Sequence, residues 1–113
     1  MCIRDRNEAI NYFHAAIWMN PSFWQARYWL GMQLVAEGKI EEAQAEFSEV
    51  VHIRPDFARA HLIYGVGLAR EGKLREAQKE FQITLQLDHE NKFAQQNLAT
   101  VQGNIQALKT YEK

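Results

Sequence analysis

The sequence predicts an all-α fold, an α-solenoid in which antiparallel helix pairs stack and a final helix covers the end. Three observations support this prediction. Apolar residues recur at helical spacing, the same pattern returns after 34 residues, and Glu-Gly-Lys separates the two helices of each pair. Because glycine just past a helix end adopts positive φ without a Cβ penalty, both Glu-Gly-Lys segments predict a helix end.

The repeat is clearest between residues 24–57 and residues 58–91, which align without a gap. Identical residues occupy eleven aligned positions. They are Ala26/Ala60, Gly31/Gly65, Leu34/Leu68, Glu37/Glu71, Gly38/Gly72, Lys39/Lys73, Glu42/Glu76, Ala43/Ala77, Gln44/Gln78, Glu46/Glu80 and Phe47/Phe81. Self-similarity of this kind indicates units that each form one supersecondary element.

Two helices are predicted in the unit 24–57. The first has an apolar stripe, and the second runs from about Ile40 to His52 before Pro55 disfavours further helix. The stripe is formed by Ala26, Leu30, Gly31 and Leu34, and the inward side of the second helix by Ala43, Phe47, Val50 and Val51. We expect Gly31 and Ala43 to let the two helices approach closely, and Phe47 to fill the space between units.

The same alignment assigns the ends of the chain. Residues 7–23 are predicted to be the second helix of a truncated repeat. Residues 92–113 lack the glycine turn and are predicted to form one continuous helix with Leu98, Val101, Ile105 and Leu108 inward. Because the other faces of this segment are polar, it suits the capping role that the last element of a repeat array needs.

Residues 1–6, Met-Cys-Ile-Arg-Asp-Arg, are interpreted as a non-native scar and are excluded from fold reasoning. One choice of codons for them reproduces the transposon end used to fragment DNA for sequencing libraries; a genuine short tail is the alternative. The scar would contain the only cysteine, Cys2, and would hide the true N-terminus. Without it, Asn7–Lys113 carries 11 cations and 13 carboxylates, a formal charge of -2.

The 34-residue unit resembles the tetratricopeptide repeat family over residues 7–99. Small and large residues that match the family's pattern carry the resemblance. They are Leu30, Gly31, Gly38, Ala43, Phe47 and Pro55, then Gly65, Gly72, Ala77 and Phe81, preceded by Ala9, Phe13, Ala16 and Pro21. The resemblance implies a right-handed superhelix. The adapter-like residues 1–6 and the half repeat that follows them lead us to expect that the chain is the C-terminal fragment of a larger protein from environmental DNA. One departure is that Arg27 and His61 stand where the family favours tryptophan.

In the resembled family the first helix of each unit lines a concave groove that binds peptides. Carried onto this sequence, the groove positions are Gln25, Tyr28, Met32, Val35, Arg59, Leu62, Val66, Ala69, Phe93 and Gln96. The carboxylate clamp of chaperone-binding members is not expected, because Tyr28 and Met32 occupy the places of its lysine and asparagine. The apolar positions favour an apolar helix or an extended peptide, with Arg59 placed to orient an acidic group.

Other classes of function find little support in the composition. A formal charge of -1 and interleaved acidic residues argue against nucleic-acid binding, and no apolar run is long enough to insert in a membrane. The four histidines lack metal-ligand spacing, although His52 and His61 flank Pro55. No catalytic motif or nucleotide fingerprint is present, so we expect a non-catalytic protein with no cofactor and no metal.

The favoured function is therefore a protein–protein interaction scaffold whose protein or peptide partner the sequence does not name. A different class stays open: an accessory tail of a larger enzyme or membrane protein, such as a bacterial glycosyltransferase or a secretion component. Self-association through the face of Asn7–Met19 that bears Tyr12, Ile17 and Trp18 is a third alternative. Cytoplasmic and periplasmic locations both stay open.

Overall fold

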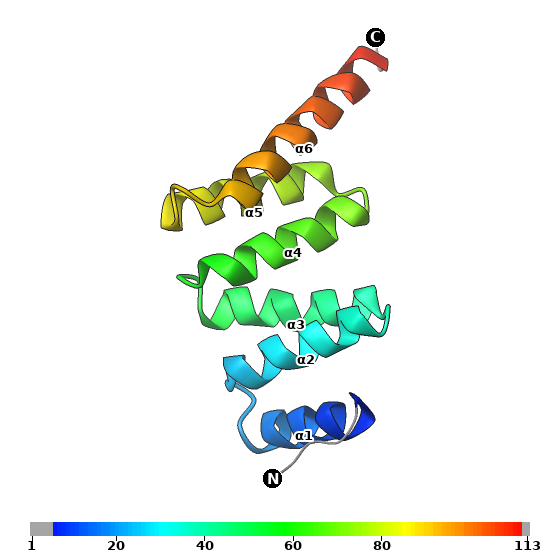
Figure 1. The fold of residues 1–113 in the computed structure, drawn as a ribbon, viewed down its shortest axis with the longest axis vertical. Coiled ribbons are helices and arrows are strands. Elements are labelled where there is room, and N and C mark those ends of the chain that lie inside the picture. Colours follow the sequence, from blue (N-terminus) through cyan, green and yellow to red (C-terminus); the bar gives the residue numbers. More distant parts are fainter. Residues whose placement is uncertain (1–5, 112–113) are drawn as a thin grey trace. The chain divides into compact units, whose positions relative to one another are not determined.

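The computed structural model describes residues 6–111, which form six α-helices and, within that range, no strand (Figure 1). The predicted scar lies outside the described residues except for Arg6, which begins the first helix. The helices are α1 (Arg6–Met19), α2 (Trp24–Ala36), α3 (Ile40–Ile53), α4 (Ala58–Arg70), α5 (Leu74–Leu87) and α6 (Lys92–Tyr111).

The chain divides into two compact units, unit 1 (Met1–Pro55) with α1 to α3 and unit 2 (Asp56–Lys113) with α4 to α6. Within each unit, consecutive helices contact one another and run in opposite directions (Figure 1). The predicted all-α repeat of antiparallel helix pairs is thus confirmed. The repeat boundaries drawn from the 34-residue period stay a prediction, because the units are delimited by contacts rather than by sequence period.

The Glu-Gly-Lys segments end α2 and α4 in the same way. Gly38 has a φ of 77° and Gly72 a φ of 80°, which are the positive φ values among the described residues. The Gly38 N–H donates to the Val35 carbonyl at 2.9 Å, and the Lys39 N–H donates to the Leu34 carbonyl at 2.8 Å. Gly72 and Lys73 make the matching bonds to Ala69 and Leu68, at 3.0 and 2.9 Å. This pair of bonds defines the Schellman motif, which satisfies carbonyls at a helix end.

A glycine and a phenylalanine set the spacing of each helix pair. A Cβ placed on Gly31 would lie 2.6 Å from Phe47 Cε1, and one placed on Gly65 would lie 2.7 Å from Phe81 Cε1. Carbon atoms in contact lie about 3.5–4.0 Å apart, so only glycine admits these rings. The Phe47 ring lies against Gly31 of its own helix pair, and its filling of the space between repeats stays a prediction.

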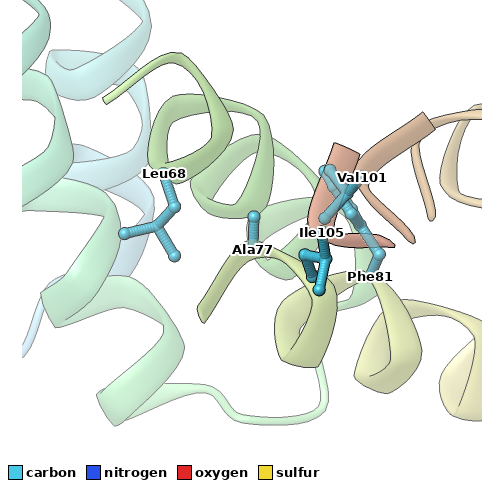
Figure 2. Close-up of a cluster of buried hydrophobic side chains, with 5 residues drawn as sticks. All are labelled: Leu68, Ala77, Phe81, Val101 and Ile105. Carbon is cyan, nitrogen blue, oxygen red and sulfur yellow. The ribbon is translucent and has the colours of Figure 1, made fainter. Parts of the chain in front are cut away.

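The core of unit 2 gathers side chains from all three of its helices. Figure 2 shows the buried cluster, which consists of Leu68 from α4, Ala77 and Phe81 from α5, and Val101 and Ile105 from α6. Phe81 and Ala77 are fully buried. The inward positions predicted for residues 92–113 are therefore confirmed for Val101 and Ile105, and Leu98 packs against the cluster.

The end of α6 differs from the prediction. Leu108, expected to face inward, is 52% exposed, and Tyr111 is 91% exposed. The reason is length, because α6 has 20 residues and α5 has 14, and the end of α6 projects past α5 (Figure 1).

The turn between α5 and α6 lacks the proline that follows α3, and an asparagine caps the next helix instead. The Ala94 N–H donates to Asn91 Oδ1 at 2.9 Å, and Asn91 Nδ2 donates to Asp88 Oδ2 at 3.2 Å. An asparagine side chain that accepts from the third helical N–H is a strong helix start. Asn91 therefore fixes the first turn of α6.

We predict that Gly38→Ala destabilises the protein by about 1 kcal/mol, because alanine is strained at positive φ. Gly103→Ala is the matched change: a Cβ there meets nothing within 4 Å, so removing a helix-interior glycine should stabilise by about 0.5–1 kcal/mol. Urea unfolding monitored by circular dichroism measures both. If both variants changed the free energy of unfolding equally and in the same direction, positive φ at Gly38 would not be the cause of its effect.

We also predict that Gly65→Ala destabilises by about 1–3 kcal/mol through overpacking against the Phe81 ring. In a Phe81→Leu background the same change should cost less, because the ring edge that it meets is gone. A double-mutant cycle in urea gives the coupling between the two sites. Additive free energies would show that the glycine is not required by Phe81.

Candidate binding surface

The first helices of the repeats, α2, α4 and α6, carry the ten predicted groove residues, four in unit 1 and six in unit 2. In unit 1, Gln25 is exposed, Met32 is 36% exposed and Val35 is half-buried. These three side chains are open to solvent to different degrees on α2.

Tyr28 requires a correction, because it lies in the interior rather than on an open surface. Its side chain is 6% exposed, and its ring centroid lies 6.2 Å from that of Phe47 and 5.3 Å from that of Trp29. A phenol ring at this register position is large enough to reach α3. Tyr28 therefore belongs to the packing of α2 against α3, and the neighbouring Trp29 is the exposed aromatic residue, at 54%.

In unit 2 the predicted residues divide into a half-buried stripe and an exposed rim. Leu62, Val66 and Ala69 on α4 are half-buried and pack against the core cluster. Arg59, Phe93 and Gln96 are exposed, with Phe93 at 69%. The half-buried stripe of Leu62, Val66 and Ala69 therefore contributes to the core of unit 2. The rim, which consists of Arg59, Phe93 and Gln96, is more accessible to solvent.

The helices α4 and α6 contact each other within unit 2, and both start on the same side of it (Figure 1). Arg59 and Phe93 are the second residues of these helices, one repeat apart. We call the surface formed by Arg59, Leu62, Val66, Phe93 and Gln96 the α4/α6 surface. It presents a cation and an aromatic ring at one end and half-buried aliphatic side chains farther along α4.

A polar side-chain contact at the same register position joins the two helices of each pair. Arg27 Nη1 lies 3.2 Å from Glu46 Oε1, with both side chains 17% exposed. One repeat later, His61 Nδ1 lies 2.7 Å from Glu80 Oε1, with side-chain exposures of 6% and 14%. Arg27 and His61 are the residues that stand where the family pattern favours tryptophan. Their role is to connect helices, so we do not assign them to ligand binding.

Two further contacts of unit 1 fix the start of α2. The Arg27 Nε–H donates to the Pro21 carbonyl at 2.9 Å, which ties the helix to the turn that precedes it. The Arg54 guanidinium carbon lies 4.9 Å from the centroid of the Trp24 ring, a cation–π contact. Arg54 and Trp24 are 30 residues apart, and no pattern in the sequence predicted this contact.

Several apolar side chains of unit 1 are exposed, and of these the sequence analysis singled out Tyr12 and Trp18 but missed Met19. Trp18 is 87% exposed, Met19 is 83% exposed and Tyr12 is 48% exposed, all on α1. Their signal was present in the composition, because no Asp, Glu, Lys or Arg occurs from Ala9 to Ala26. The N-terminal face predicted for self-association thus exposes Tyr12 and Trp18, whereas Ile17 is half-buried.

Within residues 6–111, no three His, Cys, Asp or Glu side chains are placed so that they could hold a metal ion. None of the helices in that range combines the length and the apolar character that a membrane crossing requires.

The fold places the chain among helical-repeat proteins, in which each helix pair has small and large residues at the same positions. The sequence profile of the family described as Tetratricopeptide repeat matches residues 4–66, more than half of the chain. The chain therefore belongs to the tetratricopeptide repeat family. A comparison with curated proteins finds no match.

Solved structures resemble the chain over most of its length. The TPR domain of P58(IPK) has a TM-score of 0.85 and 29% identity; the match covers 95% of this chain and 32% of that one. The first TPR of Spaghetti (RPAP3), bound to the HSP90 peptide SRMEEVD, has a TM-score of 0.81 and 19% identity, with coverages of 88% and 79%. The second TPR domain of human RPAP3, in complex with the HSP70 peptide SGPTIEEVD, has a TM-score of 0.77 and 23% identity, with coverages of 86% and 81%.

We predict that Glu46→Gln destabilises the protein by about 1–2 kcal/mol, because it weakens a largely buried bond to Arg27. Glu49→Gln is the matched control on the exposed side of α3 and should stay within about 0.5 kcal/mol of the wild type. Chemical denaturation of the two variants side by side tests this. If both variants lost similar amounts of unfolding free energy, the bond between Glu46 and Arg27 would not contribute to stability.

Proposed function

We propose that this chain is a protein-interaction scaffold that binds an apolar helix or an extended peptide on the α4/α6 surface. The observation that carries the proposal is the combination of half-buried Leu62 and Val66 with the exposed Phe93 ring on two contacting helices. Exposed aromatic side chains beside partly buried aliphatic ones are typical anchors of protein interfaces.

The relatives support the same class of function. Two of the similar structures are TPR domains that hold peptides, the first TPR of Spaghetti and the second TPR domain of human RPAP3. Their identity to this chain is below 25%, so the likeness concerns the fold and leaves the choice of ligand to the residues on the surface. On the α4/α6 surface of unit 2, Leu62 and Val66 favour an apolar ligand.

We infer a non-catalytic role for this surface from its chemistry. Aliphatic, aromatic and amide side chains dominate it, and its one charged group, the guanidinium of Arg59, offers hydrogen-bond donors but no acceptor that could serve as a nucleophile or a general base. The alternative, in which this chain is an accessory tail of a larger enzyme or membrane protein, is compatible with a non-catalytic role for the α4/α6 surface. A cytoplasmic or periplasmic location fits it equally.

Self-association through α1 is a second candidate, and the exposure of its apolar side chains favours it. Trp18 and Met19 are more than 80% exposed in the part of α1 from Ala9 onward, which contains no Asp, Glu, Lys or Arg. Exposed apolar patches of this kind mark interaction sites or association between copies. Light scattering distinguishes the two candidates, since a strictly monomeric chain leaves only the α4/α6 surface.

We predict that Phe93→Ser weakens the binding of peptides selected against the chain from a random peptide library by about 5-fold or more. Because Phe93 is 69% exposed, its loss should leave the unfolding transition unchanged. Tyr111→Ser, at a 91% exposed aromatic residue near the end of α6, is the matched control and should keep full affinity. Fluorescence anisotropy with labelled peptides measures both. Equal affinity for both variants and the wild type would refute the proposed surface.

A further inference from the structure

The first helices of the repeats carry cationic side chains and no carboxylates. Together α2, α4 and α6 hold five of the 13 cationic residues and none of the 14 carboxylates. The five cations are Arg27, Arg59, Arg70, Lys92 and Lys109. Among the second helices, α3 carries four glutamates and no Lys or Arg, whereas α5 carries two glutamates, one Arg and one Lys.

One of these cations, Arg59, belongs to the α4/α6 surface, and Lys92 directly precedes Phe93 at the start of α6. Arg59 and Lys92 are both exposed, and the structure pairs neither with a carboxylate of residues 6–111. Arg27, by contrast, is held by Glu46 and is 17% exposed in its side chain. In the sequence, the carboxylates nearest to Arg59 and Lys92 lie in the turns, at Asp56, Asp88 and Glu90, and Asp88 accepts a hydrogen bond from Asn91.

We propose that the segment bound on the α4/α6 surface is acidic, with carboxylate side chains between its apolar residues. This inference rests on the proposed function and specifies the ligand. The apolar residues would cover Leu62, Val66 and Phe93, and the carboxylates would pair with the free guanidinium of Arg59 and the ammonium of Lys92. An exposed guanidinium gives bidentate hydrogen bonds to a carboxylate at little desolvation cost.

A protein segment fits this surface better than a nucleic acid does. Both ligands would satisfy the cations, but a phosphate backbone leaves the aliphatic stripe of Leu62 and Val66 uncovered. Tight nucleic-acid binding also needs many phosphate contacts, whereas Arg59 and Lys92 are two cations in a chain of net charge -1. Charges at the edge of an interface act mainly on the association rate and on the choice of partner. The carboxylates of the ligand would therefore distinguish it from other apolar segments.

The test uses the complete chain and three synthetic peptides that share one pattern of leucines. Their polar positions hold only Glu, only Gln or only Lys. We expect the Glu peptide to bind about three- to ten-fold more tightly than the Gln peptide, and the Lys peptide to bind most weakly. The difference should shrink as the salt concentration rises, because exposed charges are screened.

Two variants with the same change of charge locate the effect. Arg59→Gln should reduce the affinity for the Glu peptide about three-fold while leaving the Gln peptide unaffected. Arg75→Gln removes an exposed cation from the first turn of α5, outside the surface, and should change neither affinity. Equal losses in the two variants would overturn the assignment to the rim.

The outcomes separate this inference from the proposed function. If the Gln peptide binds and loses affinity in Phe93→Ser, but glutamate adds nothing, the binding surface stands and its acidic specificity is wrong. If no peptide binds at about 1 mM, the proposed function fails for this surface and the inference fails with it. Tighter binding of a single-stranded oligonucleotide than of the Glu peptide at about 150 mM salt would overturn the choice of a protein partner.

Discussion

The contact between a helical glycine and a phenylalanine ring is the constraint on which the helix pairs depend. Gly31 with Phe47 and Gly65 with Phe81 leave no room for a side-chain carbon, so each pair packs at one fixed separation. That separation brings Arg27 within 3.2 Å of Glu46 and His61 within 2.7 Å of Glu80. The same fully buried rings anchor the interior of each unit. The spacing of the helices, the polar contacts between them and the formation of the core therefore follow from the pairing of a glycine with a phenylalanine.

The surface of the protein follows from this arrangement. Because Glu46 and Glu80 on the second helices pair with residues of the first helices, the first helices need no carboxylates of their own. Their remaining cations face water, and Arg59 and Lys92 reach the surface without partners among the described residues. The polarity of the α4/α6 surface is thus linked to the way in which the helices are held together.

The sequence predicted the features that depend on local backbone chemistry. Gly38 and Gly72 were identified as helix ends, and they adopt the positive φ that such ends require. Features that depend on the reach of side chains were predicted less well. Register alone placed Tyr28 in the groove, yet its ring extends toward Phe47 and is buried. Leu108 has helical spacing with Ile105, but it lies where α6 projects past α5, which no periodicity reveals.

The repeated contacts make the two helix pairs nearly interchangeable. Each first helix offers a glycine and a proton donor, and each second helix offers a phenylalanine and a glutamate at the same spacing. The contacts alone therefore do not encode which second helix joins which first helix. The three-residue connections from Glu37 to Lys39 and from Glu71 to Lys73 make that choice, by making the neighbour in sequence the nearest candidate. Correct folding of this chain is then a matter of connectivity, and high concentration during refolding favours exchange of helices between copies.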